Sequence, residues 1–290
     1  MKIKIITDSA NDLPNHILQD YDIDVLPLTV IDGSKEFRDG VDITPEELFK
    51  QMRQGTVFKT SQVTTNDYLQ KFETFIQQGK PCIYVAFSSQ LSGSYQASVI
   101  ALEQLKEKYG QDVPVHIYDT KCASLGSGLV VIKAAQLAQQ GKNIQEILKA
   151  IEFYSLHTEH IFTVFDLDYL YKGGRLKKSA AVVGNLLNLY PILDVENGNL
   201  HLIETVRGKK KHFKKVMELV EKRGMDLANQ RIGIVYGDNL DIVEEIKHEF
   251  QERFNTKEFL VRPVGSVIGA HTGPEMFSLF FFNVKTQPSE

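Results

Sequence analysis

Short apolar runs alternate with amphipathic segments along the first half of the chain. The runs have the length of buried strands, whereas the longer segments repeat apolar residues at helical spacing. We expect strands at residues 3–7, 23–30, 82–87 and 115–118, and helices at residues 14–18, 44–52, 67–77, 95–108, 129–138 and 144–156. This alternation predicts a parallel sheet with helices on both faces, and ligands bind such sheets outside the carboxyl ends of the strands.

The strand pattern restarts near residue 158, so we divide the chain into an N-terminal domain, residues 1–158, and a C-terminal domain, residues 159–290. In the second domain we expect strands at residues 161–165, near Ile192 and Leu202, and at 232–236 and 259–264, an apolar run at 276–282, and helices at 212–221 and 242–254. The turn at residues 197–199, Asn-Gly-Asn, favours an antiparallel hairpin. The predicted fold is therefore two α/β domains, the second with a mixed sheet.

An apolar helix is expected at residues 180–189. It is apolar around most of its circumference, so it is either a helix of the core or one wall of an apolar tunnel.

The apolar run at residues 82–87 ends in a serine-rich loop, residues 88–95, directly before a predicted helix. Backbone N–H groups and the positive end of the helix dipole attract anions to such a position. Ser92 supplies a hydroxyl there, and Gly93 lets a ligand approach the backbone closely. The loop is a candidate anion site, although a serine that only caps the helix would give part of the same pattern.

Two further polar loops carry hydroxyl groups or a histidine. Thr60 and Ser61 belong to the cluster at residues 60–65, and His271 lies in a glycine-rich segment, residues 265–274, which we expect to be a loop. Few charges accompany these groups, which predicts a carboxylate held by neutral donors at about 1.5–3 kcal/mol for each hydrogen bond. His271 is suited to donate to an anion or to move a proton near neutral pH, or it has a structural role.

Ser92 and His271 also raise the alternative of a stand-alone serine hydrolase or esterase. The serine is not in a Gly-x-Ser-x-Gly motif, however, and no acidic partner of His271 is identifiable from spacing. Neither a phosphate-binding P-loop nor a Gly-x-Gly-x-x-Gly motif is present. We therefore do not expect the chain to bind ATP itself.

The net charge of −4 gives no general attraction for nucleic acid or an anionic membrane. The two cysteines lack the spacing of metal ligands, so no metal site is expected, and a reduced, cytoplasmic compartment fits best. No segment has the length of a signal peptide or a membrane span, so stable membrane insertion is not expected.

Basic residues are dense only at residues 207–215, which begin with Arg207 and include Lys209. Such a run is either a solvated helix face or a surface that docks a phosphate-bearing partner. Arg175 follows two glycines and either belongs to the same surface or is an ordinary turn residue.

Taken together, the polar motifs resemble the DegV family, whose members include the fatty acid-binding subunits of bacterial fatty acid kinase. The resemblance spans the whole chain. It rests on Thr7-Asp8-Ser9 with Asp12-Leu13-Pro14, Thr60-Ser61-Gln62, Ser88-Ser89 with Leu91-Ser92-Gly93-Ser94-Tyr95, Tyr169-Leu170 with Lys172-Gly173-Gly174-Arg175, Arg207, and Gly269-Ala270-His271-Thr272-Gly273-Pro274. The sequence departs from the usual family pattern at Ser94, where threonine is common, at Tyr190, where lysine is common, and at Glu275, where glycine is common.

The resemblance implies that a long-chain fatty acid, and no cofactor, lies buried between the two domains. The carboxylate would be held by Thr60, Ser61, Ser92, Gly93 and His271. The chain would then be a carrier without catalytic residues of its own, or a lipid sensor if it has no partner.

A separate ATP-binding kinase subunit would phosphorylate the fatty acid to an acyl phosphate for phospholipid synthesis. The resemblance makes Arg175, Arg207 and Lys209 candidates for contact with that partner or with the phosphate.

Overall fold

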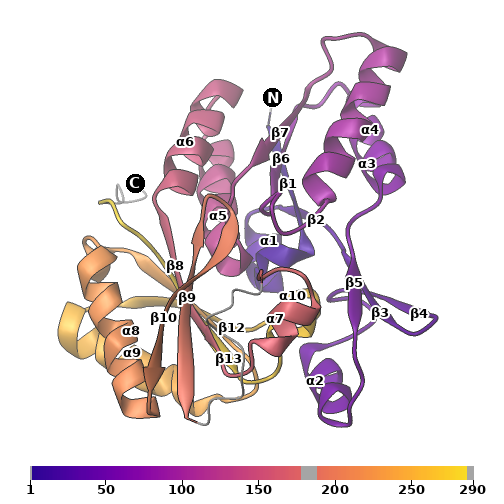
Figure 1. Ribbon diagram of the computed structural model, residues 1–290. Helices are drawn as coiled ribbons and strands as arrows, with labels where there is room; N and C mark the ends of the chain where they lie inside the picture. The colour runs from indigo at the N-terminus through magenta and orange to yellow at the C-terminus, as the bar shows by residue number, and fades with distance from the viewer. Residues whose placement is uncertain (1, 178–187, 286–290) are drawn as a thin grey trace.

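The computed structural model describes residues 2–177 and 188–285 and contains two α/β halves that lie side by side (Figure 1). The N-terminal half is built on a four-stranded sheet of order β2-β1-β6-β7, and all three of its strand pairs are parallel, as predicted. Its strands are β1 (Lys4–Asp8), β2 (Asp24–Leu26), β6 (Cys82–Ala86) and β7 (Val115–Asp119).

Two helix pairs cover the two faces of this parallel sheet (Figure 1). The pairs are α3 (Thr65–Gln77) with α4 (Ser94–Tyr109), and α5 (Ser124–Gln139) with α6 (Ile144–Leu156). The remaining helices of this half are η1 (Ser9–Asn11), α1 (Asn15–Asp20) and α2 (Pro45–Arg53). Helix α4 begins at Ser94, so the last two residues of the serine-rich segment form its first turn, and the strand–loop–helix arrangement predicted there is confirmed.

A small antiparallel sheet of order β4-β3-β5 was not predicted from the sequence. Its strands are β3 (Thr29–Asp32), β4 (Lys35–Arg38) and β5 (Lys59–Ser61). The single strand expected at residues 23–30 is wrong, because the segment divides between β2 and β3 at Pro27, which has no backbone N–H for a continuous ladder. Residues 59–61 likewise form a strand where a loop was expected, and Thr60 pairs with Val30.

The C-terminal half is built on a six-stranded sheet of order β10-β9-β8-β13-β11-β12, and this sheet is mixed, as predicted. Only the β11–β12 pair is parallel among its described pairs. Its strands are β8 (Thr158–Val164), β9 (Leu189–Glu196), β10 (Asn199–Arg207), β11 (Arg231–Tyr236), β12 (Glu258–Pro263) and β13 (Met276–Phe282). The hairpin between β9 and β10 turns at Asn197 and Gly198, which both have positive φ, so the predicted turn is confirmed.

The two faces of the mixed sheet have different neighbours. Helices α8 (Lys209–Arg223) and α9 (Asp241–Phe254) cover the outer face together with η3 (Leu227–Asn229) (Figure 1). The inner face contributes Phe162, Leu193 and Phe280 to the same apolar core as the N-terminal sheet. The two short helices α7 (Asp168–Lys172) and α10 (Ser266–Thr272) lie between the halves (Figure 1).

The chain passes from α6, which ends at Leu156, into the second sheet at Thr158. The proposed domain limits, residues 1–158 and 159–290, stay a prediction, and α10 in fact contacts α2 and β3 of the N-terminal half. Of the apolar helix expected at residues 180–189, residues 180–187 lie outside the described part of the chain, and Leu189 begins β9.

Helix α5 begins at Ser124, five residues before the predicted start of 129, and its first turns contain two glycines that are closely packed. A Cβ atom on Gly126 would lie 2.2 Å from Nε2 of His160 in β8, and one on Gly128 would lie 2.7 Å from the carbonyl oxygen of Asn11. Glycine, which disfavours helices by propensity, is required here by contact with both halves.

We expect Gly126→Ala to lower the free energy of unfolding by about 1–3 kcal/mol, since the His160 ring is buried and already accepts a hydrogen bond from the Ala123 N–H. Urea denaturation measures this change. The matched control is Ser127→Ala, because the buried Ser127 hydroxyl has no hydrogen-bond partner among the described residues and its removal should be neutral or stabilising. Equal stability of the two variants would contradict the packing argument.

Candidate functional site

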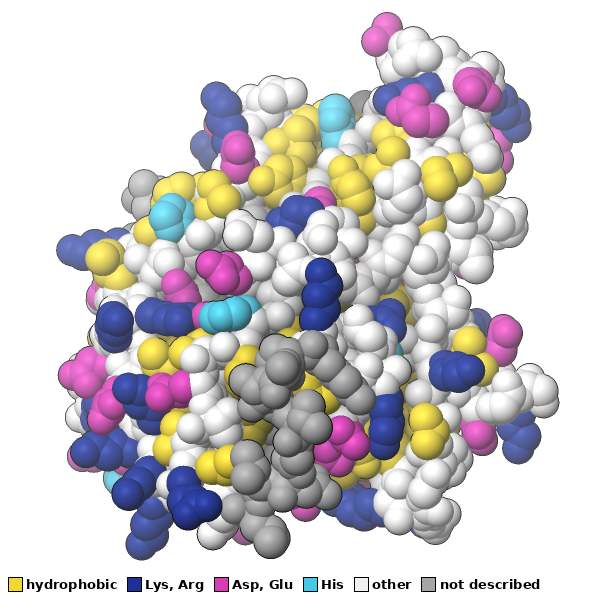
Figure 2. All heavy atoms as spheres, in the orientation of Figure 1, with side chains coloured by type: hydrophobic (Ala, Val, Ile, Leu, Met, Phe, Trp, Pro, Cys, Tyr) yellow, Lys and Arg dark blue, Asp and Glu magenta, His cyan; other side chains and the backbone are white. Residues whose placement is uncertain are grey.

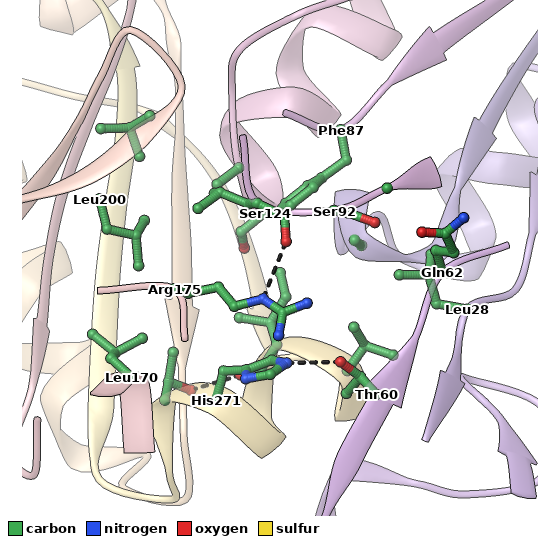
Figure 3. A pocket seen from close by; sticks show the side chains of 18 of the residues that line it. Leu28, Thr60, Gln62, Phe87, Ser92, Ser124, Leu170, Arg175, Leu200 and His271 are labelled. Carbon is green, nitrogen blue, oxygen red and sulfur yellow. Dashed lines mark hydrogen bonds between the residues drawn. The ribbon is translucent and has the colours of Figure 1, made fainter. Parts of the chain in front are cut away.

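A cavity of about 520 Å³ lies between the loops of the N-terminal half and the inner face of the mixed sheet (Figure 3). Both halves contribute to its apolar wall. The apolar lining residues are Ala10, Leu28, Phe87, Leu91, Ala123, Phe162, Leu170, Val195, Leu200, Val267, Ile268, Met276 and Phe280. A volume of this size is typical of a small-molecule site.

All five predicted carboxylate-binding residues line this one cavity. They are Thr60, Ser61, Ser92, Gly93 and His271, which come from three separate segments of the chain. Figure 3 shows Ser92 and Thr60 across the cavity from Leu200, His271 beside Thr60, and Arg175 between His271 and Ser92. Oγ1 of Thr60 and Nε2 of His271 lie 2.7 Å apart. The structure brings these residues together, and their role in binding stays a prediction.

His271 lies in the last turn of α10, so the loop expected at residues 265–274 is wrong in its centre. The glycines that indicated a loop instead flank the helix, since Gly265 is its N-cap and Gly273, with φ 76°, ends it. Gly269 lies inside α10, where a Cβ atom would be only 3.0 Å from the ring of Phe49 in α2.

Two buried carboxyl groups of the N-terminal half fix the start of α10. Oδ1 of Asp39 accepts from the backbone N–H groups of Ser266 and Val267, at 3.0 and 3.3 Å, and Oδ1 of Asp12 accepts from the Gly265 N–H at 2.8 Å. These bonds satisfy N–H groups that a helix leaves without partners at its N-terminus. They therefore set the position of His271 at the other end of the short helix.

The imidazole of His271 is neutral at pH 7. Burial, with a smaller contribution from the charge of Arg175, lowers the pKa of His271 to about 4. Its Nδ1 atom is buried and has no hydrogen-bond partner among the described residues. Gly173 makes room for this edge of the ring, because a Cβ atom there would lie 2.1 Å from Nδ1.

Only Ser92 among the four serines of the serine-rich loop lines the described cavity. Its Oγ atom donates to Oγ of Ser94 at 3.0 Å. Ser88 donates to the carbonyl oxygen of Gly198, and Ser89 accepts from the Lys121 ammonium group, so both have structural partners elsewhere. Gly93 allows Gln62, from the polar cluster at residues 60–65, to approach the serine-rich loop closely. A Cβ atom at position 93 would overlap the side chain of Gln62.

Arg175 also lines the cavity, which brings a positive charge to a site where the three predicted loops supply none. Its Nε donates to the carbonyl oxygen of Leu91 at 3.1 Å and its Nη1 to that of Gly173 at 2.6 Å, and the first of these bonds is drawn in Figure 3. Burial lowers the pKa of Arg175, which still leaves the guanidinium charged.

A second cavity, of about 470 Å³, shares a wall with the first. Thr60, Arg175 and His271 line both cavities, and Lys59 and Lys172 line the second alone. The two cavities therefore adjoin each other at the polar residues Thr60, Arg175 and His271.

Arg207 and Lys209 are not among the described residues that line either cavity. Arg207 ends β10 and Lys209 begins α8, and both side chains are exposed. Figure 2 shows Lys and Arg side chains gathered on the side of the molecule where α8 lies. The structure thus separates these two residues from Arg175, with which they were grouped as candidates for partner contact.

The cavity wall from the mixed sheet, with Phe162, Leu200, Met276 and Phe280, was not predicted as part of the site. Its only signal in the sequence is the apolar character of the strands, which indicates burial without saying what covers them.

The geometry does not support the alternative of a serine hydrolase. Ser92 Oγ is bonded to Ser94 and His271 Nε2 to Thr60, so the two do not form the expected nucleophile–base pair. Among residues 2–177 and 188–285, no cluster of three or more His, Cys, Asp or Glu side chains is arranged to hold a metal ion. In the same part of the chain no helix combines the length and apolar character of a membrane span.

Known proteins resemble this chain over almost its whole length. Residues 2–284 match a family model described as an uncharacterised protein of the DegV family. A DegV domain-containing protein of Clostridium perfringens is 38% identical over 290 residues, with 99% of each chain covered. A DegV family protein from Thermus thermophilus described by its fatty acid binding has a TM-score of 0.87 at 29% identity, covering 98% of this chain and 100% of its own. A DegV lipid-binding protein from Thermotoga maritima has a TM-score of 0.84 at 31% identity, covering 97% and 98%.

We expect the imidazole of His271 to stay neutral down to a pH of about 4 in an NMR titration, with His271→Gln used to assign its resonance. Histidine in the unfolded chain titrates near 6.5, so between about pH 4 and 6.5 the unfolded state binds more protons. His271 should therefore make the fold less stable as the pH falls through this window, and His271→Gln should remove that part of the acid sensitivity. A midpoint near 6.5 in the folded protein would contradict the burial of this ring.

Proposed function

The chain belongs to the DegV family, and we propose that it binds a long-chain fatty acid in the first cavity and presents its carboxylate to an ATP-dependent kinase subunit. One observation carries the proposal: a single cavity combines an apolar wall with the uncharged donors Thr60, Ser92 and His271, which come from three separate segments. The relatives described as fatty-acid- or lipid-binding support it. The protein would act in the cytoplasm, where ATP is available, as a carrier that needs no cofactor.

The acyl chain would lie against the inner face of the mixed sheet, along Phe162, Leu200, Met276 and Phe280. Burial of about fifteen methylene groups at ~0.8 kcal/mol each contributes on the order of 12 kcal/mol before the costs of association and ordering. Fatty acid should therefore remain bound through purification, and native mass spectrometry would detect it.

The carboxylate would lie at the polar side, within reach of the hydroxyl groups of Thr60 and Ser92 and of Nε2 of neutral His271. Arg175 is the one charged residue among the described residues that line this cavity, and its guanidinium already donates to the carbonyl oxygens of Leu91 and Gly173. The other donors are neutral and leave the negative charge on the carboxylate oxygens, so one of them keeps its nucleophilic character. In the proposed reaction this oxygen attacks the terminal phosphorus of ATP, the bond to the ADP oxygen breaks, and acyl phosphate and ADP form.

In this proposal the kinase subunit reaches the carboxylate from the second cavity. Thr60, Arg175 and His271 line both cavities, so the second cavity adjoins the place where the carboxylate would lie. Lys59 and Lys172 on its rim are suited to phosphate oxygens. Arg207 and Lys209 lie on a different, exposed surface and would contact the body of the kinase subunit.

We expect Ser92→Ala to weaken fatty acid binding by roughly tenfold to a hundredfold, since a hydrogen bond to a charged group contributes about 1.5–3 kcal/mol. Displacement of a fluorescent fatty acid by hexadecanoate measures this. Ser89→Ala is the matched control, because this serine of the same loop bonds to Lys121 and should bind the ligand as the unchanged protein does. Equal affinity of both variants would contradict the assignment of Ser92.

We expect the double variant Arg207→Glu, Lys209→Glu to lower the rate of acyl phosphate formation by the kinase subunit about tenfold or more, with unchanged affinity for fatty acid. The loss should be largest at low salt, because exposed charges are screened at high ionic strength. Lys222→Glu, at the other end of α8, is the control. A loss of the same size in the control would show a general charge effect and contradict a docking role for the start of α8.

A further inference from the structure

One hydroxyl group lies within the apolar wall that the mixed sheet gives to the first cavity. Ser278 belongs to β13, between Met276 and Phe280, and all three side chains line the cavity. Side chains two positions apart on a strand point to the same face of the sheet. Ser278 therefore faces the cavity with an apolar side chain before it and another after it along the strand.

The strands on both sides of Ser278 are apolar at the same level. Ser278 pairs with Phe162 of β8, and Phe162 pairs in turn with Leu193 of β9. On its other side Ser278 pairs with Val235 of β11. All three partners belong to the apolar core that the two halves share. Across the sheet, the Ser278 hydroxyl thus meets side chains that neither donate nor accept hydrogen bonds.

The Ser278 hydroxyl is buried without a hydrogen-bond partner in the described part of the chain. The residue is only 4% exposed, and its side chain bonds to no other described residue. The other buried hydroxyl groups of the described cavity wall are satisfied by the protein, because Ser124 donates to Asp12 and Thr272 to the carbonyl oxygen of Ile268.

A buried hydroxyl group without a partner is costly, and it offers both a donor and an acceptor. Ser278 therefore presents to the cavity a polar group that a ligand can satisfy.

His160 is a second polar side chain on this face of the sheet, and it has a partner of its own. It pairs with Phe280, which places it diagonally from Ser278, at about 7–8 Å between Cα atoms. Its Nε2 atom accepts from the Ala123 N–H at 3.1 Å. Burial lowers the pKa of His160 to about 4, so the ring is neutral at pH 7. A ligand group at this level meets the Ser278 hydroxyl and no charge.

Ser278 lies some distance from the polar end of the cavity. Strand β8 leads toward α7 and β13 follows α10, and these two helices, which carry Leu170 and His271, contact each other. Met276 is the first residue of β13, and Ser278 lies two residues, ~7 Å, further along the strand. Phe280 continues the wall beyond it. An acyl chain with its carboxylate near His271 would therefore pass Ser278 with the interior of the chain.

We infer that Ser278 is a specificity-determining residue, and that the preferred ligand is a fatty acid with a hydroxyl group in the interior of its chain. The inference rests on the proposed function, because it needs an acyl chain along the mixed sheet. A plain hydrocarbon chain would cover the Ser278 hydroxyl without giving it a partner. A hydroxyl group on the chain accepts from Ser278 or donates to it, so that neither group is left unpaired.

The test measures the affinity of the delipidated protein for hexadecanoate and for hydroxyhexadecanoates that carry the hydroxyl group at successive positions along the chain. Displacement of a fluorescent fatty acid reports each affinity. We expect one interior isomer to bind about threefold to tenfold tighter than the isomers on either side of it, which is the effect of one net hydrogen bond. All these ligands have the same carboxylate, so its contribution cancels in the comparison.

Ser278→Ala should remove this preference. In the variant the interior isomer should bind no tighter than its neighbours, and hexadecanoate should bind at least as tightly as it does to the unchanged protein, because no hydroxyl is left unpaired beside the chain. Ser127→Ala is the matched control. It also removes a buried serine hydroxyl without a partner among the described residues, at a position outside the described cavity wall, and should keep the preference.

The isomer series in the unchanged protein decides the question even if Ser278→Ala fails to fold. Equal affinities, or a steady change from one end of the chain to the other, would overturn the inference. A preference that persists in Ser278→Ala, or that is lost to the same extent in Ser127→Ala, would also overturn it. If neither hexadecanoate nor any isomer binds, the proposed function fails and the inference fails with it.

Discussion

The site depends on the hydrogen bonds by which Asp12 and Asp39 hold the start of α10. These carboxyl groups come from the N-terminal half, whereas α10 follows the last parallel strand of the mixed sheet. Without them, backbone N–H groups at the start of a seven-residue helix would be buried and unpaired. The contact between His271 and Thr60, two residues 211 positions apart, is a consequence of this anchoring.

The same hydrogen bonds explain why two buried acidic residues, Asp12 and Asp39, lie close to a site that is proposed to bind an anion. Desolvation raises the pKa of Asp12 to about 6 and also raises that of Asp39, so both carboxyl groups are costly to ionise where they lie. Arg262 and the N–H groups at the start of α10 offset part of that cost. The buried carboxyl groups thus lie behind the cavity wall, while Arg175 is the one charged group among the described residues that line the cavity itself.

Much of the fold follows from the sequence, because apolar periodicity and turn residues act locally. The parallel sheet, the mixed sheet and the hairpin at Gly198 are confirmed, and residues of the three polar segments line one cavity. The sequence did not reveal the strand break at Pro27, where one continuous strand was expected. The glycines around α10 were interpreted as a loop, because the residues that end a helix are also typical of loops. Tyr68 and Tyr84 occupy positions of apolar spacing, so nothing in the sequence shows that the Tyr68 hydroxyl donates to that of Tyr84, and the Tyr84 hydroxyl to Asp8, inside the core. The cavity itself is a long-range property, because a strand that faces a ligand and one that faces another side chain have the same apolar pattern.

The close approach of α5 to both sheets has a consequence for how specificity is distributed over the molecule. Helix α5 packs against β1 of the first sheet and against β8 and β11 of the second, and at Gly126 the contact with the His160 ring leaves this helix little room to move toward the mixed sheet. Residues such as Leu200 and Met276 can then vary in size and alter the length and shape of the tail that the proposed ligand could have, while the frame around them stays the same. Selectivity and architecture are in this way assigned to different parts of the polypeptide.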